Sequence, residues 1–247
     1  KYMKAQKYYE IRKHPYTFHA IVVHDKYEGL WRIKFGGKKG CVMFSLYEDE
    51  EYTNLDGLAY GKECMPGLGT VMMAQAAFGF IMHLFPTKRG IMLKDQSKIT
   101  CNKNKILSLQ HYYIAKHMKT WYEAKFGATL LYDKDRREYE KLRGALREKY
   151  KAGEFDGFAE QYVKNCMHEI LSTYYQSCST YTEFLKNLAD DHDCIIFDKW
   201  LFTFMTSISD YKFSDAFWII DYAQVSCDQL HIKKMKTKPQ FDYIVHG

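Results

Sequence analysis

Proline is scarce in this sequence, with 4 residues among 247. This scarcity, together with 27% charged residues, argues against a proline-rich linker protein or a disordered chain. The sequence also lacks an apolar run of the ~20 residues that a transmembrane helix needs. Its longest apolar block covers residues 71–85. We therefore expect a folded protein without a transmembrane segment.

Paired cysteine motifs are also missing. The sequence has 7 cysteines, an odd number, and none of them forms a Cys-x-x-Cys pair. This pattern predicts free thiols in a reducing compartment. The segment "DDHDC" (190–194) has no second ligand pair, so we expect no metal. Residues 1–15 contain no apolar run of signal-peptide length, and the expected location is therefore cytoplasmic.

Dense runs of basic residues are absent as well. The formal net charge is only +6, and the basic residues cluster no further than "GGKKG" (36–40) and "HIKKMKTK" (231–238). Nucleic-acid binding is therefore the weakest of the functional hypotheses, because it depends on dense phosphate contacts. A well-solvated surface explains the same charge more simply.

The residues that are abundant predict an α+β protein. Hydrophobic residues make up 47% of the chain and aromatic residues 17%, enough for a substantial core. Segments 17–25, 30–36, 41–48 and 90–95 are short and rich in aliphatic or aromatic residues, as strands are. Segment 52–60 is a weaker strand candidate. The apolar block 71–85 predicts a buried helix, and 106–126 a second helix that ends at Gly127.

The pattern changes near residue 132. Beyond it, helical spacing predominates, and we expect helices up to a last one at 214–225 that Ser214 and Asp215 would cap. The sequence therefore predicts an α/β domain over residues 1–132 and a mainly helical part over 133–247.

A glycine loop precedes the buried helix. The phrase "CMPGLGT" places Gly67 and Gly69 just before 71–85. A helix N-terminus exposes unpaired N–H groups, and glycines allow a phosphate to come close to them. The same glycines also serve as ordinary turn residues. The loop lacks the Lys-Ser/Thr end of a P-loop and the third glycine of a dinucleotide fingerprint.

The loop and a later phrase together resemble the GNAT-type N-acetyltransferases. The pattern of that family is Gln/Arg-x-x-Gly-x-Gly/Ala, and here Cys64, Gly67 and Gly69 occupy its first, fourth and sixth places. The later phrase "KTWYEAKFGATLL" is similar to the "FYEKLGF" that ends a helix in the family. The sequence around this phrase also resembles acetyltransferase-like proteins of large cytoplasmic DNA viruses. The resemblance covers roughly residues 16–132.

The resemblance implies an acetyltransferase-like mixed, twisted sheet with flanking helices and acetyl-CoA in a split between two strands. It implies that Gly67, Leu68, Gly69 and Thr70 hold the pyrophosphate. Tyr122 is the implied acid for the leaving thiolate, and Asp56 or Glu63 the candidate base. A protein lysine or another amine would be the acceptor.

Several positions depart from the family pattern. Cys64 replaces the long polar residue, Pro66 has no N–H for a phosphate, and Ala115 and Ala128 replace the usual asparagine and phenylalanine. These departures leave a second interpretation open. In it, the chain is an inactive acetyltransferase-like structural or interaction protein, in the host cytoplasm or as a component of a virion, and assembles with protein partners.

Overall fold

The computed structural model describes residues 4–36, 40–58, 64, 68–102, 105–150, 154–211, 213, 215–225, 230–239 and 244–245. The chain divides into two compact units. The first contains Lys1–Leu93, Phe126–Ala128 and Trp218–Gly247, and the second contains Lys94–Lys125 and Thr129–Phe217. This division differs from the predicted boundary near 132, because the chain leaves the first unit at Leu93 and returns to it at Trp218.

The first unit is built on a large mixed sheet. Its strands are β1 (Lys4–Lys13), β2 (Tyr16–Asp25), β3 (Leu30–Phe35), β4 (Val42–Tyr47), β5 (Tyr52–Leu58), β6 (Gly90–Lys94), β10 (Phe217–Asp221), β11 (His231–Met235) and β12 (Ile244–Val245). The strand order is β11-β1-β2-β3-β4-β5-β6-β10, and β12 pairs with β2. The predicted α+β class is therefore confirmed.

Alternation of apolar and polar residues fixes the register of the antiparallel strands. Ile33 faces Val22 on one side and Phe44 on the other, and all three side chains are buried. Arg32 and Lys34, between the inward-facing residues of β3, are exposed. A slip by one residue would exchange these two sets, so burial of one face specifies the pairing.

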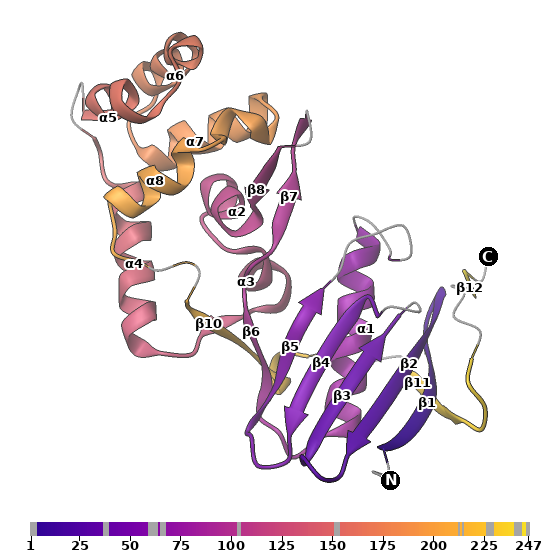
Figure 1. The fold of residues 1–247 in the computed structure, drawn as a ribbon. Coiled ribbons are helices and arrows are strands. Elements are labelled where there is room, and N and C mark those ends of the chain that lie inside the picture. Colours follow the sequence, from indigo (N-terminus) through magenta and orange to yellow (C-terminus); the bar gives the residue numbers. More distant parts are fainter. Residues whose placement is uncertain are drawn as a thin grey trace. The chain divides into compact units, whose positions relative to one another are not determined.

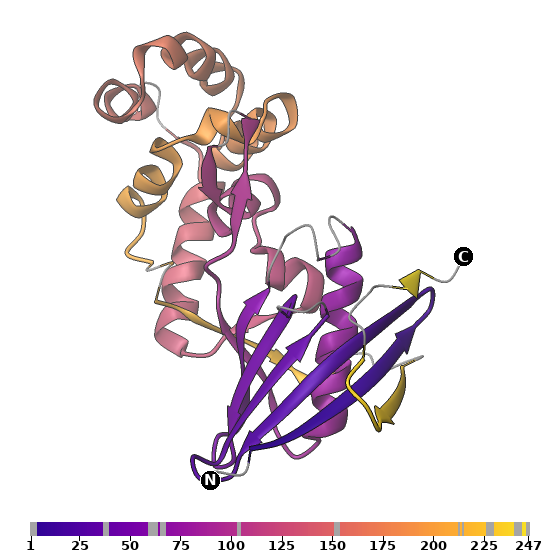
Figure 2. The same ribbon diagram turned by 45° about the vertical axis from the view of Figure 1, so that its right-hand side comes forward.

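Helix α1 (Leu68–Leu84) lies across that apolar face, as Figures 1 and 2 show. Phe78 packs edge-on against Phe44 at 6.1 Å, and Phe80 against Tyr9 at 5.2 Å, between ring centroids. Helix α1 is apolar on almost every face, and its residues Met73, Ala77 and Ile81 are fully buried. The prediction of a buried helix is confirmed.

Strand β6 follows α1 and runs parallel to β5, whereas each pair of neighbouring strands from β1 to β5 is antiparallel. β10 lies next to β6 although more than a hundred residues separate them in sequence. A Cβ atom at Gly90 would come within 2.4 Å of the Ile220 carbonyl oxygen, so the two strands approach closely at a glycine.

The last predicted helix was wrong. Residues Phe217–Asp221 form β10 instead, and Tyr222–Gln224 form one 3-10 turn, η3. Buried Trp218 and Ile220 alternate with more exposed Phe217 and Ile219, which is the period of a strand. Ser214, the proposed cap, lies outside the described residues. The C-terminal part is thus helical only up to Ser207.

The second unit is mainly helical. Its elements are β7 (Lys98–Thr100), β8 (Ile106–Ser108), α2 (Leu109–His117), α3 (Trp121–Phe126, whose last residue belongs to the first unit), β9 (Thr129–Leu130), α4 (Asp133–Arg147), α5 (Glu154–Tyr162), α6 (Asn165–Ser177), α7 (Tyr181–Asp191), η2 (Cys194–Phe197) and α8 (Trp200–Ser207). Packed rings form its core, with Phe155 beside Phe184, Trp200 and Phe204 at centroid distances of 5.0–5.8 Å.

The predicted single helix over 106–126 is interrupted. Residues Ile106–Ser108 pair with β7, and α2 ends where Met118 adopts a left-handed conformation with φ 56°. Gly127, the predicted stop after Phe126, has φ 65°, in the region where glycine has no steric penalty. The predicted end of the helix is therefore confirmed, whereas its continuity is not.

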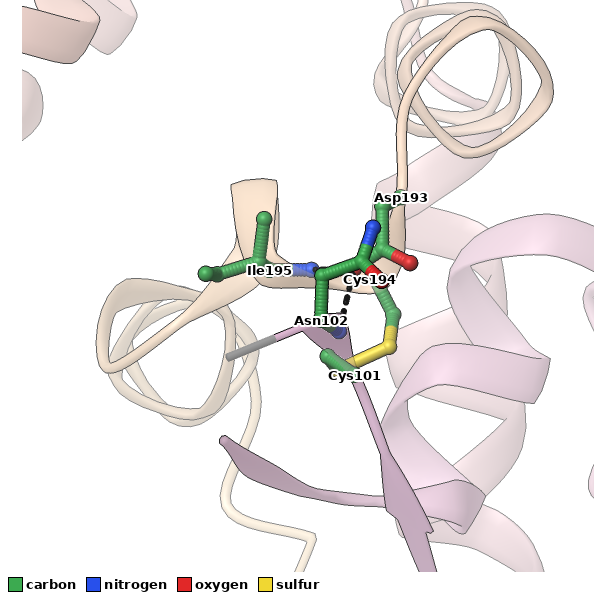
Figure 3. The surroundings of a disulfide bond; sticks show 5 residues. All are labelled: Cys101, Asn102, Asp193, Cys194 and Ile195. Atoms are coloured by element: carbon green, nitrogen blue, oxygen red, sulfur yellow. Dashed lines mark hydrogen bonds between the residues drawn. A yellow bond between two sulfur atoms is a disulfide. The ribbon is translucent and has the colours of Figure 1, made fainter. Parts of the chain in front are cut away.

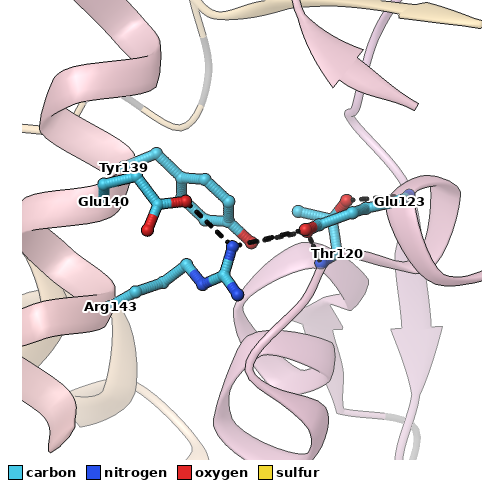
Figure 4. A network of polar contacts seen from close by, with 5 residues as sticks. All are labelled: Thr120, Glu123, Tyr139, Glu140 and Arg143. Carbon is cyan, nitrogen blue, oxygen red and sulfur yellow. Dashed lines mark hydrogen bonds and ion pairs between the residues drawn. The ribbon is translucent and has the colours of Figure 1, made fainter. Parts of the chain in front are cut away.

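A polar network connects α3 with α4 (Figure 4). Thr120 Oγ1 accepts the Glu123 N–H at 3.2 Å, and Glu123 Oε2 accepts the Thr120 N–H at 3.1 Å, which is a capping box. The Glu123 carboxylate also accepts the Tyr139 hydroxyl at 2.9 Å and pairs with Arg143 at 3.4 Å. Arg143 pairs in turn with the exposed Glu140. Glu123 thus stabilises one helix start and joins two helices.

Replacement of Glu123 by alanine is expected to lower the free energy of unfolding by about 3 kcal/mol, because it leaves a largely buried guanidinium and a buried phenol without their shared acceptor. Glu140→Ala is the control, since it removes an exposed partner of the same arginine and should cost less than about 1 kcal/mol. Urea denaturation of both variants measures the difference. Equal losses would contradict this account of the network.

Candidate functional site

The carboxyl end of β5 is where the two parallel strands stop pairing. The register between β5 and β6 joins Tyr52 to Gly90, Thr53 to Ile91 and Asn54 to Met92. β5 then continues to Leu58 with β4 as its partner, so in the described residues its other edge has no partner strand from Leu55 onward. Ligands of α/β sheets bind beyond the carboxyl ends of parallel strands. We take this end of β5 as the candidate site.

Asp56 occupies an irregular position in β5 at this end. Gly57 pairs with Met43 and Leu55 with Phe44, so Asp56 is the extra residue of a β-bulge. Its Oδ1 accepts the Ser45 hydroxyl at 2.8 Å. Asp56 is exposed, yet partial desolvation by its surroundings raises the pKa of its carboxyl above the ordinary value, while the Ser45 hydrogen bond and Arg32 oppose the rise. A bulge that re-aims a carboxylate is common next to active sites.

The start of α1 supplies the backbone groups that an anion would need. Leu68, Gly69 and Thr70 form its first turn, which contains no acidic residue. The first four N–H groups of a helix have no intrahelical acceptor, and the helix dipole adds partial positive charge there. Two of the predicted site residues, Glu63 and Gly67, lie outside the described residues. Leu68, Gly69 and Thr70 therefore represent the predicted loop.

A disulfide anchors the loop before α1. Cys64 is bonded to Cys41, with both residues buried and their Cα atoms 5.6 Å apart. The Cys41 N–H is bonded to the carbonyls of Phe35 and Gly36, at the end of the β3–β4 hairpin. This corrects the expectation of free thiols, and the Cys64 side chain is committed to the bond. Among the described residues, Cys178 alone is a free cysteine.

Tyr122 belongs to the second unit, whereas Asp56 and the first turn of α1 belong to the first. Its side chain is 4% exposed and hydrogen-bonded to the Ser97 side chain. Burial, followed by the charge of Asp95, raises the pKa of the Tyr122 phenol above its usual range. The phenol is therefore held neutral and retains its proton.

The sequence interpretation missed Asp95 and Ser97. Asp95 is 5% exposed, and its Oδ1 accepts the Ser97 N–H at 3.2 Å. Its Oδ2 has no hydrogen-bond partner among the described residues, and burial raises the pKa of this carboxyl. The signal was present, since "KDQS" places an acid directly after a strand. Because Asp95 was predicted only as the last residue of the strand 90–95, nothing local indicated its burial.

A second disulfide explains the cysteine of the "DDHDC" segment. Cys194 is bonded to Cys101, and the Asp193 carboxylate accepts the N–H groups of Asn102 and Ile195 (Figure 3). Cys101, Asp193 and Cys194 are the one set of potential metal ligands that lie close together in the described part of the chain. Because the disulfide joins both sulfurs, they do not offer thiolate ligands.

Comparison with known proteins gives no family assignment. No protein-family model matches the chain, and no curated protein or solved structure matches it either. Within the described residues, none of the helices has the length and apolar character required to cross a bilayer.

The Cys41–Cys64 bond is expected to stabilise the first unit. Replacing both cysteines by serine should lower the free energy of unfolding by about 3 kcal/mol, because 23 residues separate the linked positions and the unlinked chain regains that loop entropy. Chemical denaturation measures the effect. Cys178→Ser is the matched control and should change stability by less than about 0.5 kcal/mol. An unchanged midpoint in the double variant would refute the bond.

Proposed function

We propose that the chain is an acyl-CoA-dependent N-acyltransferase of the GNAT type, which transfers an acetyl group to an amine or a protein lysine. The observation that carries the proposal is the short parallel register between β5 and β6, three residue pairs long, beside the first turn of α1. The β-α-β connection brings the start of α1 to the carboxyl end of β5. An extended acyl-CoA needs both an open strand edge and an anion site, and this arrangement offers both.

The strand edge suits the pantetheine arm of the coenzyme. Backbone groups of β5 from Leu55 to Leu58 pair with β4 on one side. On the other side they can pair with the amide groups of an extended ligand, as a sheet edge does with an added strand. The N–H groups at Gly69 and Thr70 suit the pyrophosphate. The Cys41–Cys64 disulfide restrains the chain before α1. Less conformational entropy of the protein is therefore lost when a ligand binds there.

The strand order gives further support. β10 comes from the end of the chain yet lies next to β6, so the helical segment is an insertion within the sheet-forming chain. A mixed sheet that contains the parallel pair of β5 and β6 fits the mixed sheet that the sequence resemblance implies. The β-bulge at Asp56 lies in β5, just beyond Asn54, the last residue that pairs with β6.

The chemical roles follow from the described side chains. Acyl-CoA supplies the activated acyl group. Asp56 would accept a proton from the acceptor ammonium or amine, directly or through water. The sequence resemblance assigns Tyr122 as the proton donor to the leaving sulfur; its phenol stays protonated, but it belongs to the second unit and the proposal does not rest on it. The carboxylate of Asp56 gains basicity from its partial desolvation.

A second candidate function is supported by the disulfides. Two disulfides fit an oxidising environment, such as the surface of a virus particle, better than the reducing cytosol. An inactive acetyltransferase-like protein that assembles with protein partners in a virion would have this property. In that case Cys64 would keep the loop in place without binding a ligand.

Coenzyme A is expected to raise the melting temperature. At about 100 times its dissociation constant, it should add about 2.7 kcal/mol to the stability of the native state. Thr70→Glu should abolish the shift, because a carboxylate in the first turn repels the pyrophosphate while it suits the helix dipole. Thr70→Gln is the neutral control and should retain the shift. No shift with the unaltered protein at millimolar coenzyme A would exclude the enzyme and favour the second candidate.

The acid limb of the pH profile of kcat/KM is expected to reflect the ionisation of Asp56. Activity should fall as the pH falls through the pKa of this carboxyl, and that pKa lies above the ordinary aspartate value. The Ser45 hydroxyl favours the ionised form of Asp56. Ser45→Ala removes this hydrogen bond, so the pKa of Asp56 should rise and the acid limb should move to higher pH. Asp56→Asn should lower kcat/KM by about 10²-fold or more. An acid limb that does not move in Ser45→Ala would remove Asp56 from the role of base.

A further inference from the structure

A cavity of about 360 Å³ opens on the first unit at the other end of α1. It is lined by Lys7, Tyr9, Trp31, Glu48, Phe85 and Lys88, together with aliphatic side chains. Leu84, the last residue of α1, is also part of the lining. With a rise of 1.5 Å per residue, it lies about 24 Å along the helix from Leu68. The cavity is therefore separate from the candidate acyltransferase site.

Aromatic rings form the walls of this cavity. The Trp31 ring is stacked on the His24 imidazole with centroids 3.9 Å apart and planes 3° from parallel. The Phe85 ring meets Trp31 edge-on at 5.4 Å. Buried Val22 and Leu46 complete the apolar lining. Neighbours on two sides thus fix the indole, which gives a flat ligand a rigid surface to pack on.

Of the charged side chains at the cavity, Glu48 and Lys88 have polar partners, whereas Lys7 has no carboxylate partner among the described residues. Glu48 Oε1 lies 3.0 Å from His24 Nε2. The Lys88 ammonium donates to the backbone carbonyl oxygens of Glu48 and Glu50. The Lys7 ammonium lies 5.7 Å from the centre of the Trp31 ring and has no carboxylate partner among the described residues. One cation therefore remains available beside the aromatic wall.

We propose that this cavity binds a small aromatic carboxylate of one or two fused rings, with the ring against Trp31 and Phe85 and the carboxylate at the Lys7 ammonium. The volume is near the lower limit of small-molecule sites, so it suits such a ligand and is too small for a dinucleotide. The carboxylate would form a charge-assisted hydrogen bond with Lys7. Glu48, already next to His24, would disfavour a second carboxylate on the ligand.

Ligand-observed NMR and calorimetry with the full chain test the proposal. The probes are indole-3-acetate and 2-naphthoate, with the neutral indole-3-acetamide for comparison. We expect both acids to bind with a dissociation constant at or below about 1 mM, and the amide to bind more weakly. Lys7→Met should weaken the acids about tenfold or more and leave the affinity of the amide unchanged.

Lys34→Met is the matched control, because Lys34 is an exposed lysine on the opposite face of β3. It should leave the affinity for every probe unchanged. The proposal would be overturned by failure of both acids to bind at several millimolar, by equal affinity for acid and amide, or by equal effects of the two lysine variants. These measurements involve no coenzyme A, so their outcome is independent of the proposed acyltransferase activity.

Discussion

The burial of α1 is the constraint on which the first unit depends. Its side chains are apolar on almost every face, so the helix must lie against a broad apolar surface, and the inward faces of β1 to β4 provide one. The strand that follows the helix then returns parallel to the strand that precedes it. This connection brings the start of α1 to the carboxyl end of β5. The first turn of α1, the bulge at Asp56 and the open strand edge therefore share one end of the sheet.

The disulfides change how the loop is understood. As a sequence position, Cys64 replaces a polar residue that the resemblance leads one to expect in contact with phosphate. In the structure, its sulfur joins the loop to the hairpin at Cys41. A helix N-terminus binds anions through backbone N–H groups, which need no particular side chain. A fixed loop with backbone donors is compatible with catalysis and also with an inactive scaffold, which is why coenzyme binding has to separate the two.

Local sequence patterns correctly predicted the elements in which apolar residues either alternate with polar ones or form one continuous run. Strand β3, with Trp31, Ile33 and Phe35 alternating with charged residues, and helix α1 were both identified in this way. β1 was missed because "KAQKYYEIRK" is mostly polar at a sheet position that is largely half-buried. β10 was mistaken for a helix because "AFWII" is a short apolar run, in which helix and strand cannot be distinguished by period.

Long-range contacts account for the rest of what the sequence did not reveal. The linked cysteines are 23 and 93 residues apart, and no local spacing indicates such pairs. Asp95 was predicted as the end of a strand, and its burial could not be predicted because it depends on the fold rather than on its neighbours in sequence. The aromatic cavity combines Lys7 of β1, Trp31 of β3 and Phe85, the residue that follows α1. For the candidate site, Asp56 and the first turn of α1 could be proposed from the sequence, whereas their relation to the strand register required the fold.

Hydrogen–deuterium exchange with and without acetyl-CoA tests the central claim most directly, because it locates the ligand on the chain. The account predicts slower exchange of the backbone N–H groups of residues 68–71, which lack intrahelical acceptors, and of β5 residues 55–58. Residues 154–207 should exchange at unchanged rates. Unchanged exchange at both 55–58 and 68–71 under saturating acetyl-CoA would contradict the account.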